Sequence, residues 1–187
     1  MNEIIESLLS RRSVRAFEER AVPAAEKEAI LLAAVNAPTA GCQQLYTILD
    51  VTDPELKARL AESCDHQPFI AKAPLVLIFC ADCQKWYDAF LAGGCAPRLP
   101  GAGDLLLAVD DSLIAAQNAV TAAWSLGVGS CIDVMRGERA PALLGLPDYV
   151  FPAAMVVFSY QTAGQKARTK PERYAMERSC GRTATAG

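Results

Sequence analysis

The stretch over residues 105–126 constrains the fold of this chain more than any other segment. Its apolar residues recur at alternating steps of three and four, which places them on one stripe of a helix; they are Leu106, Val109, Leu113, Ala116, Val120 and Ala123. A second stripe, of mostly small residues, lies on another face, and its members are Ala115, Ala119, Ala122 and Leu126. A helix that is apolar on two sides is buried on two sides. The sequence therefore predicts that this helix is the centre of a domain or of a dimer.

Polar residues within the same stretch argue against a membrane span. Asp110, Asp111, Gln117 and Asn118 are costly in lipid. The N-terminal residues 1–15 carry acidic side chains where a secretory signal has basic ones, and no long apolar run follows them. We therefore expect a cytoplasmic protein with no membrane partner.

The composition suits one domain with a sizeable core. Of the 187 residues, 52% are hydrophobic and 21% are charged, which excludes disorder as a description of the whole chain. The net charge of −3 provides no broad basic field, so we expect no nucleic-acid partner. Seven cysteines, an odd number at irregular spacing, indicate reduced thiols rather than a disulfide framework. We expect a single domain over 1–187, in which about 162–187 form a basic C-terminal tail.

The rest of the chain alternates helices and strands without a repeat or a flexible linker. Helices are predicted at 2–10, 23–37, 54–62 and 140–144, and strands at 46–51, 74–80, 130–134 and 153–160. The run 74–80 is continuously apolar, as expected for a strand that is covered on both faces. Residues 93–103 are predicted to form a surface loop that leads into the long helix. The chain is therefore a mixed α and β domain.

The densest polar cluster follows the first predicted helix. Arg11, Arg12, Ser13 and Arg15 offer three guanidinium groups and a hydroxyl, which suit a phosphate. The alternative is a solvated basic helix end that favours the helix dipole. A second basic cluster lies near the end of the chain, and consists of Arg168, Lys170 and Arg173. If the two clusters meet in space, they form an anion site for one phosphate monoester.

Between these clusters, residues 38–44 form a loop of small residues and two amides. Its relevant members are Pro38, Thr39, Ala40, Gln43 and Gln44. Such a loop can lie close to a planar ring system and form hydrogen bonds to its edge. The alternative is a simple connection between a helix and a strand.

In this order, the segments resemble the FMN-dependent nitroreductases. Residues 11–15 look like that family's opening phosphate and ribityl motif, and residues 37–46 resemble its APSxxNxQPW loop. Residues 111–118, followed by Leu-Gly-Val-Gly-Ser-Cys at 126–131, resemble its central helix and glycine break. Residues 170–174 look like its basic C-terminal element. The resemblance extends over nearly the whole chain.

This resemblance implies an α+β, three-layer fold with a central mixed, mainly antiparallel sheet flanked by helices, in an intertwined homodimer. Two FMN sites would lie at the subunit interface. The implied activity moves a hydride from NADH or NADPH through FMN to a small organic acceptor, such as a nitroaromatic or a quinone, with ping-pong kinetics. The flavin carries this chemistry, so no side chain is expected to act as nucleophile or general base, and no metal is expected.

The resemblance also assigns roles to individual residues. Arg11, Arg12 and Ser13 would hold the phosphate and ribityl chain, with Lys170 and Arg173 closing over the phosphate. Arg15 would lie near the N1–C2=O edge of the flavin, where a cation stabilises the anionic reduced form. The remaining contacts would come from Pro38, Thr39 and Ala40 of the partner subunit, from Gln43 or Gln44, and from Ile132 and Asp133.

The sequence departs from the family pattern in two places. Cys42 stands where relatives usually have Asn, and Leu45 and Tyr46 stand where they have Pro-Trp. After Cys131, the segment that approaches the flavin in relatives is shortened. Asp133 then adds negative charge beside the reactive edge, which would disfavour a reduced anionic flavin.

Other interpretations remain open at this stage. Cys80 and Cys83 form a C-x-x-C motif after a strand, which would suit a thiol-redox protein. His66 is the single histidine; it either contacts substrate from a loop or is structural or exposed. Trp86 and Tyr87 line a lid or simply pack. A non-catalytic module that binds or senses flavin is the further alternative.

Overall fold

A four-stranded sheet and one long helix organise the part of the chain that the computed structural model describes, residues 1–133 and 139–180. The strands are β1 (Tyr46–Asp50), β2 (Leu75–Asp82), β3 (Gly129–Asp133) and β4 (Val150–Ser159). The helices are α1 (Glu3–Ser10), α2 (Ala24–Val35), α3 (Pro54–Ser63), α4 (Pro68–Lys72), α5 (Gln84–Ala92), α6 (Ala102–Ser125), α7 (Arg139–Leu144), α8 (Ala163–Ala167) and α9 (Met176–Ser179). A short 3-10 turn, η1 (Ala40–Cys42), precedes β1.

The strands lie in the order β1-β2-β4-β3, and all three neighbouring pairs are antiparallel. The predicted sheet, mainly antiparallel, is therefore confirmed. Its parallel component is an isolated bridge between Ser13 and Ser130. Pro152 in β4 lies opposite Cys80, where the register of β2 shifts. A proline has no N–H for the sheet ladder, so it is tolerated at such an irregularity.

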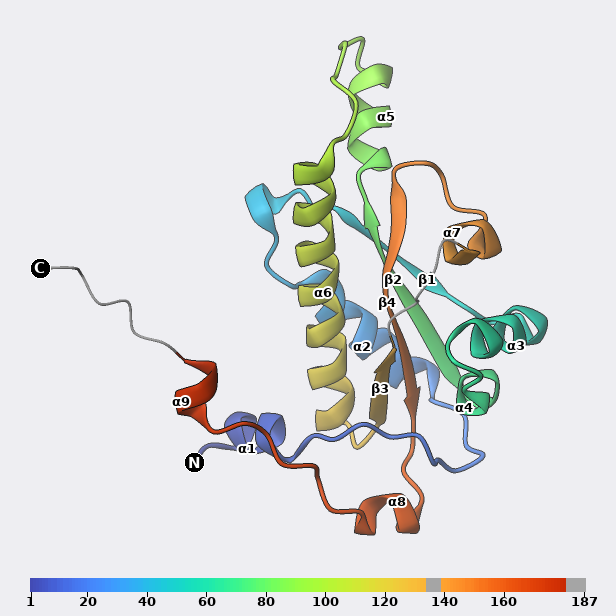
Figure 1. Cartoon of the computed structure of the whole chain (residues 1–187), viewed down its shortest axis with the longest axis vertical. Helices are drawn as coiled ribbons and strands as arrows, with labels where there is room; N and C mark the ends of the chain where they lie inside the picture. The colour runs from blue at the N-terminus through green and yellow to red at the C-terminus, as the bar shows by residue number, and fades with distance from the viewer. Residues whose placement is uncertain (134–138, 181–187) are drawn as a thin grey trace, which may run out of the picture.

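Helices cover both faces of the sheet, which gives the predicted three layers (Figure 1). On one face, α2 and α6 pack against Leu77, Phe79 and Phe158. On the other face, a second cluster joins α3 and α4 to Val76, Ile78 and Met155, and half-buried leucines around α7 pack against it. Consecutive residues of β2 thus point to opposite faces and are all buried, as its continuous apolar run predicts.

Four helices, α4, α5, α8 and α9, are absent from the sequence prediction, and α6 begins inside the predicted loop 93–103. Helices α4, α8 and α9 have four or five residues, too few for a periodic pattern to stand out. Gly101 precedes the first helical residue of α6, and its backbone N–H donates to Asp104. Strand β4 starts at Val150 rather than at the predicted residue 153, because residues 150–152 pair with the end of β2. Val134, the last residue of the predicted strand 130–134, lies outside the described residues.

The long helix α6 is the predicted central helix, but the described chain does not bury it on two sides: Leu106, Leu113 and Leu126 of the predicted stripes are exposed. Its fully buried residues face the sheet and α2, and the amide of Asn118 donates to the backbone oxygen of Ala33 in α2. By length and composition alone this helix would also suit a membrane span. In the described structure, however, it packs against β2 and β4, and it buries the carboxylate of Asp111.

Candidate functional site

The segment that follows α1 runs beside the beginning of β3 and carries the first basic cluster. The N–H of Val14 donates to the oxygen of Ser130 at 2.9 Å, and the Val14 side chain is fully buried against Gly129. A Cβ atom on Gly129 would lie 2.4 Å from Cγ2 of Val14. This close approach, which requires a glycine, sets the backbone position from which residues 11–15 project.

Gln165 fixes the same segment from the other side. Its side chain is buried; Oε1 accepts from the N–H groups of Arg15 and Ala16 at 3.4 and 3.3 Å, and Nε2 donates to the oxygen of Ser13 at 3.3 Å. One amide thus satisfies three backbone groups. Gln165 lies in the predicted polar tail, and nothing in the sequence around it marks it as a buried residue.

The structure brings the two basic clusters together at the lower end of α6, where α1 and the chain after α8 meet (Figure 1). Lys170 Nζ donates to the oxygen of Leu9, at the end of α1. Burial lowers the pKa of Lys170, and the nearby charges of Arg11, Arg173 and Arg12 lower it further. The charges that lower the pKa of this amine are thus those of three arginines, drawn from both basic clusters.

Arg12 makes a contact that the sequence does not predict. Its Nη1 donates to the backbone oxygens of Lys166 (3.2 Å) and Arg168, so the guanidinium ties the end of α8 to the segment after α1. Its Nε is buried and has no partner among the described residues. Arg12 therefore positions the second basic cluster, whereas Arg11 adds its charge to the cluster.

Asp133 lies at the end of β3 in a second polar group. Its carboxylate is buried, and its Oδ1 accepts from Nε2 of Gln67 at 3.3 Å. Burial raises the pKa of Asp133, while the hydrogen bond from Gln67 and the charge of Arg15 partly oppose this shift. The positive charge of Arg15 therefore acts on the carboxylate of Asp133. Ile132, the preceding residue, is exposed.

The loop over residues 38–44 is held in a strained conformation. Cys42 and Gln44 have φ angles of 55° and 50°, values that are uncommon for residues other than glycine. Asp111 of α6, almost fully buried, accepts from the N–H of Ala40 at 3.1 Å through Oδ1 and from the N–H of Leu45 at 3.3 Å through Oδ2. The carboxylate thus spans both ends of the turn.

Further contacts hold this loop from α5 and α2. Trp86 Nε1 donates to the oxygen of Gln43 at 2.8 Å, and Lys85 Nζ donates to the oxygen of Gln44 at 3.0 Å. Both glutamines are exposed; the amide of Gln44 donates to the oxygen of Val35, whereas the side chain of Gln43 makes no hydrogen bond to the described residues. Pro38 is also exposed, and Thr39 accepts from the N–H of Gln44.

Within one chain, the loop 38–44 and the basic clusters lie beside different positions along the length of α6. Asp111 holds the loop, while Trp124 donates through Nε1 to Ser10 beside the basic clusters. At about 1.5 Å per residue, these two points of α6 lie about 20 Å apart. The predicted cofactor contacts of a single chain therefore form two separate groups.

The remaining candidates lie outside these groups. All seven cysteines fall in the described ranges and are free thiols. Burial and Asp82 raise the pKa of Cys80 to about 12, and burial, Asp104 and Asp82 raise that of Cys83. The thiol-redox interpretation needs a thiol of low pKa, so these values argue against it. His66 is exposed in the turn before Gln67. Among the described residues, no cluster of His, Cys, Asp and Glu is arranged to hold a metal.

Comparison with known proteins defines the class. The chain matches the Nitroreductase family over residues 8–160 and belongs to that family. It is 34% identical over 165 residues to an FMN reductase [NAD(P)H] of Bacillus subtilis (strain 168), a match that covers 86% of this chain and 66% of the relative. The chain thus spans slightly less than two thirds of the length of this curated relative.

Solved structures agree with this assignment. NfrA2 of B. megaterium superposes with a TM-score of 0.88 at 31% identity, over 100% of this chain and 76% of that one. An NADPH:FMN oxidoreductase from Vibrio harveyi, complexed with NAD+, superposes with a TM-score of 0.89 at 25% identity, over 100% of this chain and 79% of that one. The predicted family and fold are therefore confirmed.

Proposed function

We propose that this chain is an FMN-dependent oxidoreductase that passes a hydride from NADH or NADPH to a small organic acceptor, such as a nitroaromatic or a quinone. The observation that carries the proposal is that the second basic cluster lies against the segment after α1: Lys170 donates to the oxygen of Leu9, and Arg12 donates to the oxygens of Lys166 and Arg168. The names of the relatives, FMN reductase and NADPH:FMN oxidoreductase, support the choice of cofactor and reductant.

The residues present fit the phosphate of FMN. Burial lowers the pKa of Lys170 most, and repulsion from the three arginines lowers it further; an anion placed among these cations would relieve the repulsion. Arg11, Ser13, Lys170 and Arg173 would hold the phosphate and ribityl chain, and Arg12 would keep the tail in place. When bound, FMN supplies the hydride chemistry, and this chain's own residues bind and orient it.

The loop 38–44 and β3 would supply the remaining contacts. Pro38, Thr39, Ala40 and the free amide of Gln43 would contact the flavin of the partner subunit, because in one chain they lie far from the basic clusters. Ile132, Asp133 and Arg15 would lie along the flavin edge of their own subunit. Gln44, also a predicted contact, would act by fixing the loop through Val35.

Removing one phosphate contact should weaken FMN binding while leaving the fold intact. Arg11→Ala or Ser13→Ala should cost about 1.5–3 kcal/mol of binding free energy, roughly a ten- to hundredfold loss of affinity. Titration of the apoprotein, followed by quenching of flavin fluorescence, measures this loss. Glu62→Gln at an exposed position of α3, away from α1, is the control and should leave the affinity unchanged. Unaltered titration curves for both variants would contradict the assignment.

We further propose a homodimer that buries α1 and one face of α6. Large apolar side chains are exposed on both helices, among them Ile4 (67%), Leu9 (58%) and Leu106 (67%). Large apolar side chains exposed along two helices are typical of an interaction surface. Light scattering at low micromolar concentration should therefore give twice the chain mass of 20.0 kDa. A stable monomer under these conditions is the result that would refute the dimer.

Asp133 and Arg15 should tune the reduction potential of bound FMN in opposite directions. Asp133→Asn should raise the potential, because it removes a negative charge, and Arg15→Ala should lower it, because it removes a positive one. Burial raises the pKa of Asp133. The effect of Asp133→Asn should therefore be largest above that pKa and shrink as the pH falls through it. Potentiometric titration of both variants tests this; reversed signs would show that the residues do not flank the ring.

A non-catalytic flavin-binding module is the second candidate, favoured by Asp133 at the end of the shortened β3 segment. The two candidates differ in their response to reductant. In a working reductase, the yellow colour of bound FMN bleaches on addition of NADH or NADPH, whereas in a binding module the flavin stays yellow. Steady-state kinetics of the reductase should be ping-pong, because one site serves the nicotinamide and the acceptor in turn.

We place the protein in the cytoplasm, with no nucleic-acid or membrane partner.

A further inference from the structure

A cavity of about 450 Å³ lies beside the first turn of α6, at the end of that helix away from the basic clusters. Its walls come from Ala102 and Leu105 of α6, from Leu146 and Pro147 after α7, and from Phe151 of β4. Figure 1 shows these segments meeting where the chain from α7 turns into β4. The volume falls within the range of sites for small organic molecules. None of the residues assigned above to the flavin is among the described residues that line it.

The wall is apolar and carries two aromatic rings. Tyr149 and Phe151 occupy alternate positions where β4 begins, and both line the cavity. The ring of Tyr149 packs against that of Tyr87, with centroids 5.8 Å apart, and its backbone oxygen accepts from the N–H of Cys83 at 3.0 Å. Phe151 is exposed although it is large and apolar. The cavity therefore offers a fixed aromatic side chain and an open one to an apolar ligand.

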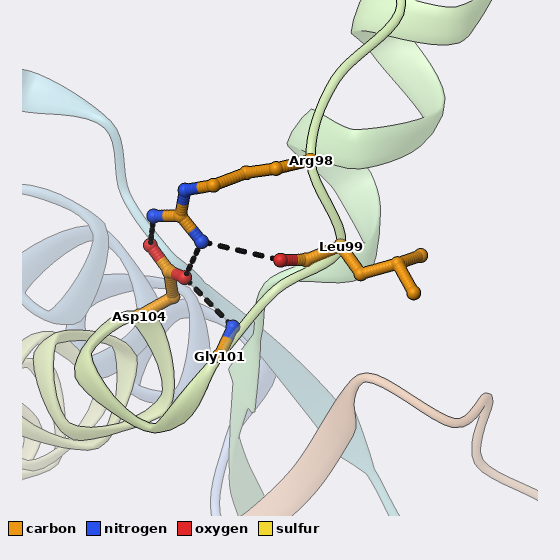
Figure 2. A network of polar contacts seen from close by, with 4 residues as sticks. All are labelled: Arg98, Leu99, Gly101 and Asp104. Atoms are coloured by element: carbon orange, nitrogen blue, oxygen red, sulfur yellow. Dashed lines mark hydrogen bonds and ion pairs between the residues drawn. The ribbon is translucent and has the colours of Figure 1, made fainter.

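The charge that faces the cavity is negative. Asp148, exposed in the turn before β4, is the only Asp, Glu, Lys, Arg or His among the described lining residues. The guanidinium of Arg98 comes close, since its Nη1 would lie 4.0 Å from a Cβ atom on Gly101. Figure 2 shows, however, that this group is turned toward Asp104: Nη1 and Nη2 donate to Oδ2 and Oδ1 at 2.6 and 2.8 Å. The pair is neutral in sum, so Arg98 does not offset Asp148.

Negative charge also acts on the buried side of the wall. Cys83 lines the cavity, and burial raises the pKa of its thiol, which the charges of Asp104 and Asp82 raise further. Asp104 is balanced by Arg98, whereas Asp82 is buried and belongs to none of the ion pairs among the described residues. The thiol therefore stays neutral at pH 7, and the surroundings disfavour an anion in the cavity.

We propose that this cavity binds an apolar organic cation, such as an aryl- or alkylammonium, with the cationic group near Asp148 and the apolar part against Phe151 and Leu105. Aromatic rings attract a cation placed over their faces, which adds to the attraction of the carboxylate. A neutral ligand would gain only the apolar contacts, and an anion would be repelled. The site does not rest on the proposed function, because none of the residues assigned to the flavin contributes to it.

Isothermal titration calorimetry of the purified protein with three benzyl compounds tests the ligand class. Benzyltrimethylammonium, benzyl alcohol and benzoate place a cation, a neutral group and an anion on the same ring. The cation should bind with the highest affinity and benzoate with the lowest. The absence of saturable binding by benzyltrimethylammonium, or benzoate binding as tightly as the cation, would overturn the proposal.

A matched pair of substitutions tests the location. Phe151→Leu keeps an apolar side chain but removes the ring, so it should weaken binding of the cation about two- to fivefold relative to benzyl alcohol. Phe90→Leu is the control: Phe90 lines a neighbouring cavity that shares Cys83 and Pro100 with this one, and it is similarly exposed (47%, against 42% for Phe151). It should leave the ratio of the two affinities unchanged. A loss in the Phe90 variant alone would place the cation in the neighbouring cavity and refute this site.

The role of Asp148 is tested by a change of charge. Asp148→Asn should lower the affinity for the cation about two- to fivefold, the effect of one exposed charge, and leave that for benzyl alcohol unchanged. Glu28→Gln, the same charge change at an exposed position of α2, should alter neither affinity. Equal effects of the two substitutions would show that only the net charge of the protein matters.

Filling the cavity gives an independent test. Ala102→Phe and Leu105→Trp each add a ring at an exposed lining position, where the fold should tolerate it, and urea unfolding checks that it does. At least one of them should abolish measurable binding of benzyltrimethylammonium. Unchanged affinity in both folded variants would show that the cation binds elsewhere.

Discussion

Gly129→Ala is expected to lower the free energy of unfolding by about 1–3 kcal/mol, the usual cost of forcing an extra methyl into a packed core. The new Cβ would lie 2.4 Å from Cγ2 of Val14 and 3.1 Å from Cγ of Gln161. Val14 is completely buried and is tied to β3 through Ser130, so it has little room to move. The segment 11–15 must shift instead. FMN affinity should therefore fall together with stability, and urea unfolding and flavin titration measure the two effects.

Gly103→Ala is the matched control, because nothing lies within 4 Å of its added Cβ and the residue is in a helix. It should be neutral or stabilising by up to about 1 kcal/mol. A double variant with Val14→Ala removes Cγ2 and should lose less stability than the sum of the two single changes. Strict additivity would show that the clash with Val14 is not the cause.

The sequence predicted the sheet and the long helix because each has a strong local signal. The apolar run before Cys80 requires burial on both faces of the sheet, and the apolar residues around Ala116 require burial of the face of α6 that packs against it. The predicted helices 2–10 and 54–62 are confirmed as α1 and α3, which begin at the side-chain caps Asn2 and Asp53. Helices α4, α8 and α9, of four or five residues, are too short to produce such a signal.

The candidate site was less accessible to sequence reasoning because it depends on long-range contacts. The spacing of Arg11 and Lys170 in the chain does not show that they meet; this follows from the antiparallel pairing that brings the end of β4 beside the segment after α1. Gln165 was missed for the same reason. Asp111 did carry a signal, a carboxylate in an apolar helix, but the prediction used it as an argument against lipid and as part of the family resemblance, not as a contact to the loop 38–44.

Asp111→Ala should lower the free energy of unfolding by about 2–5 kcal/mol. The change leaves the N–H groups of Ala40 and Leu45 without their acceptor, and a buried donor left unsatisfied costs about 1–3 kcal/mol. The loop between them has positive φ at Gly41, Cys42 and Gln44, so it should relax when the clamp is removed. Urea unfolding measures the global loss, and hydrogen exchange at the Leu45 amide measures the local one.

The control for this prediction is Asn118→Ala, which lies on the same helix and removes a single bond, to the oxygen of Ala33. It should cost about 1 kcal/mol and leave exchange at Leu45 unchanged relative to the new global stability. Asp111→Asn should fall between the two, because its remaining oxygen can accept from one N–H while its NH₂ faces the other. If Asp111→Ala costs no more than Asn118→Ala, or if the Leu45 amide stays protected, then the strain of the loop is held by Trp86, Lys85 and Gln44 instead, and the carboxylate is not its clamp.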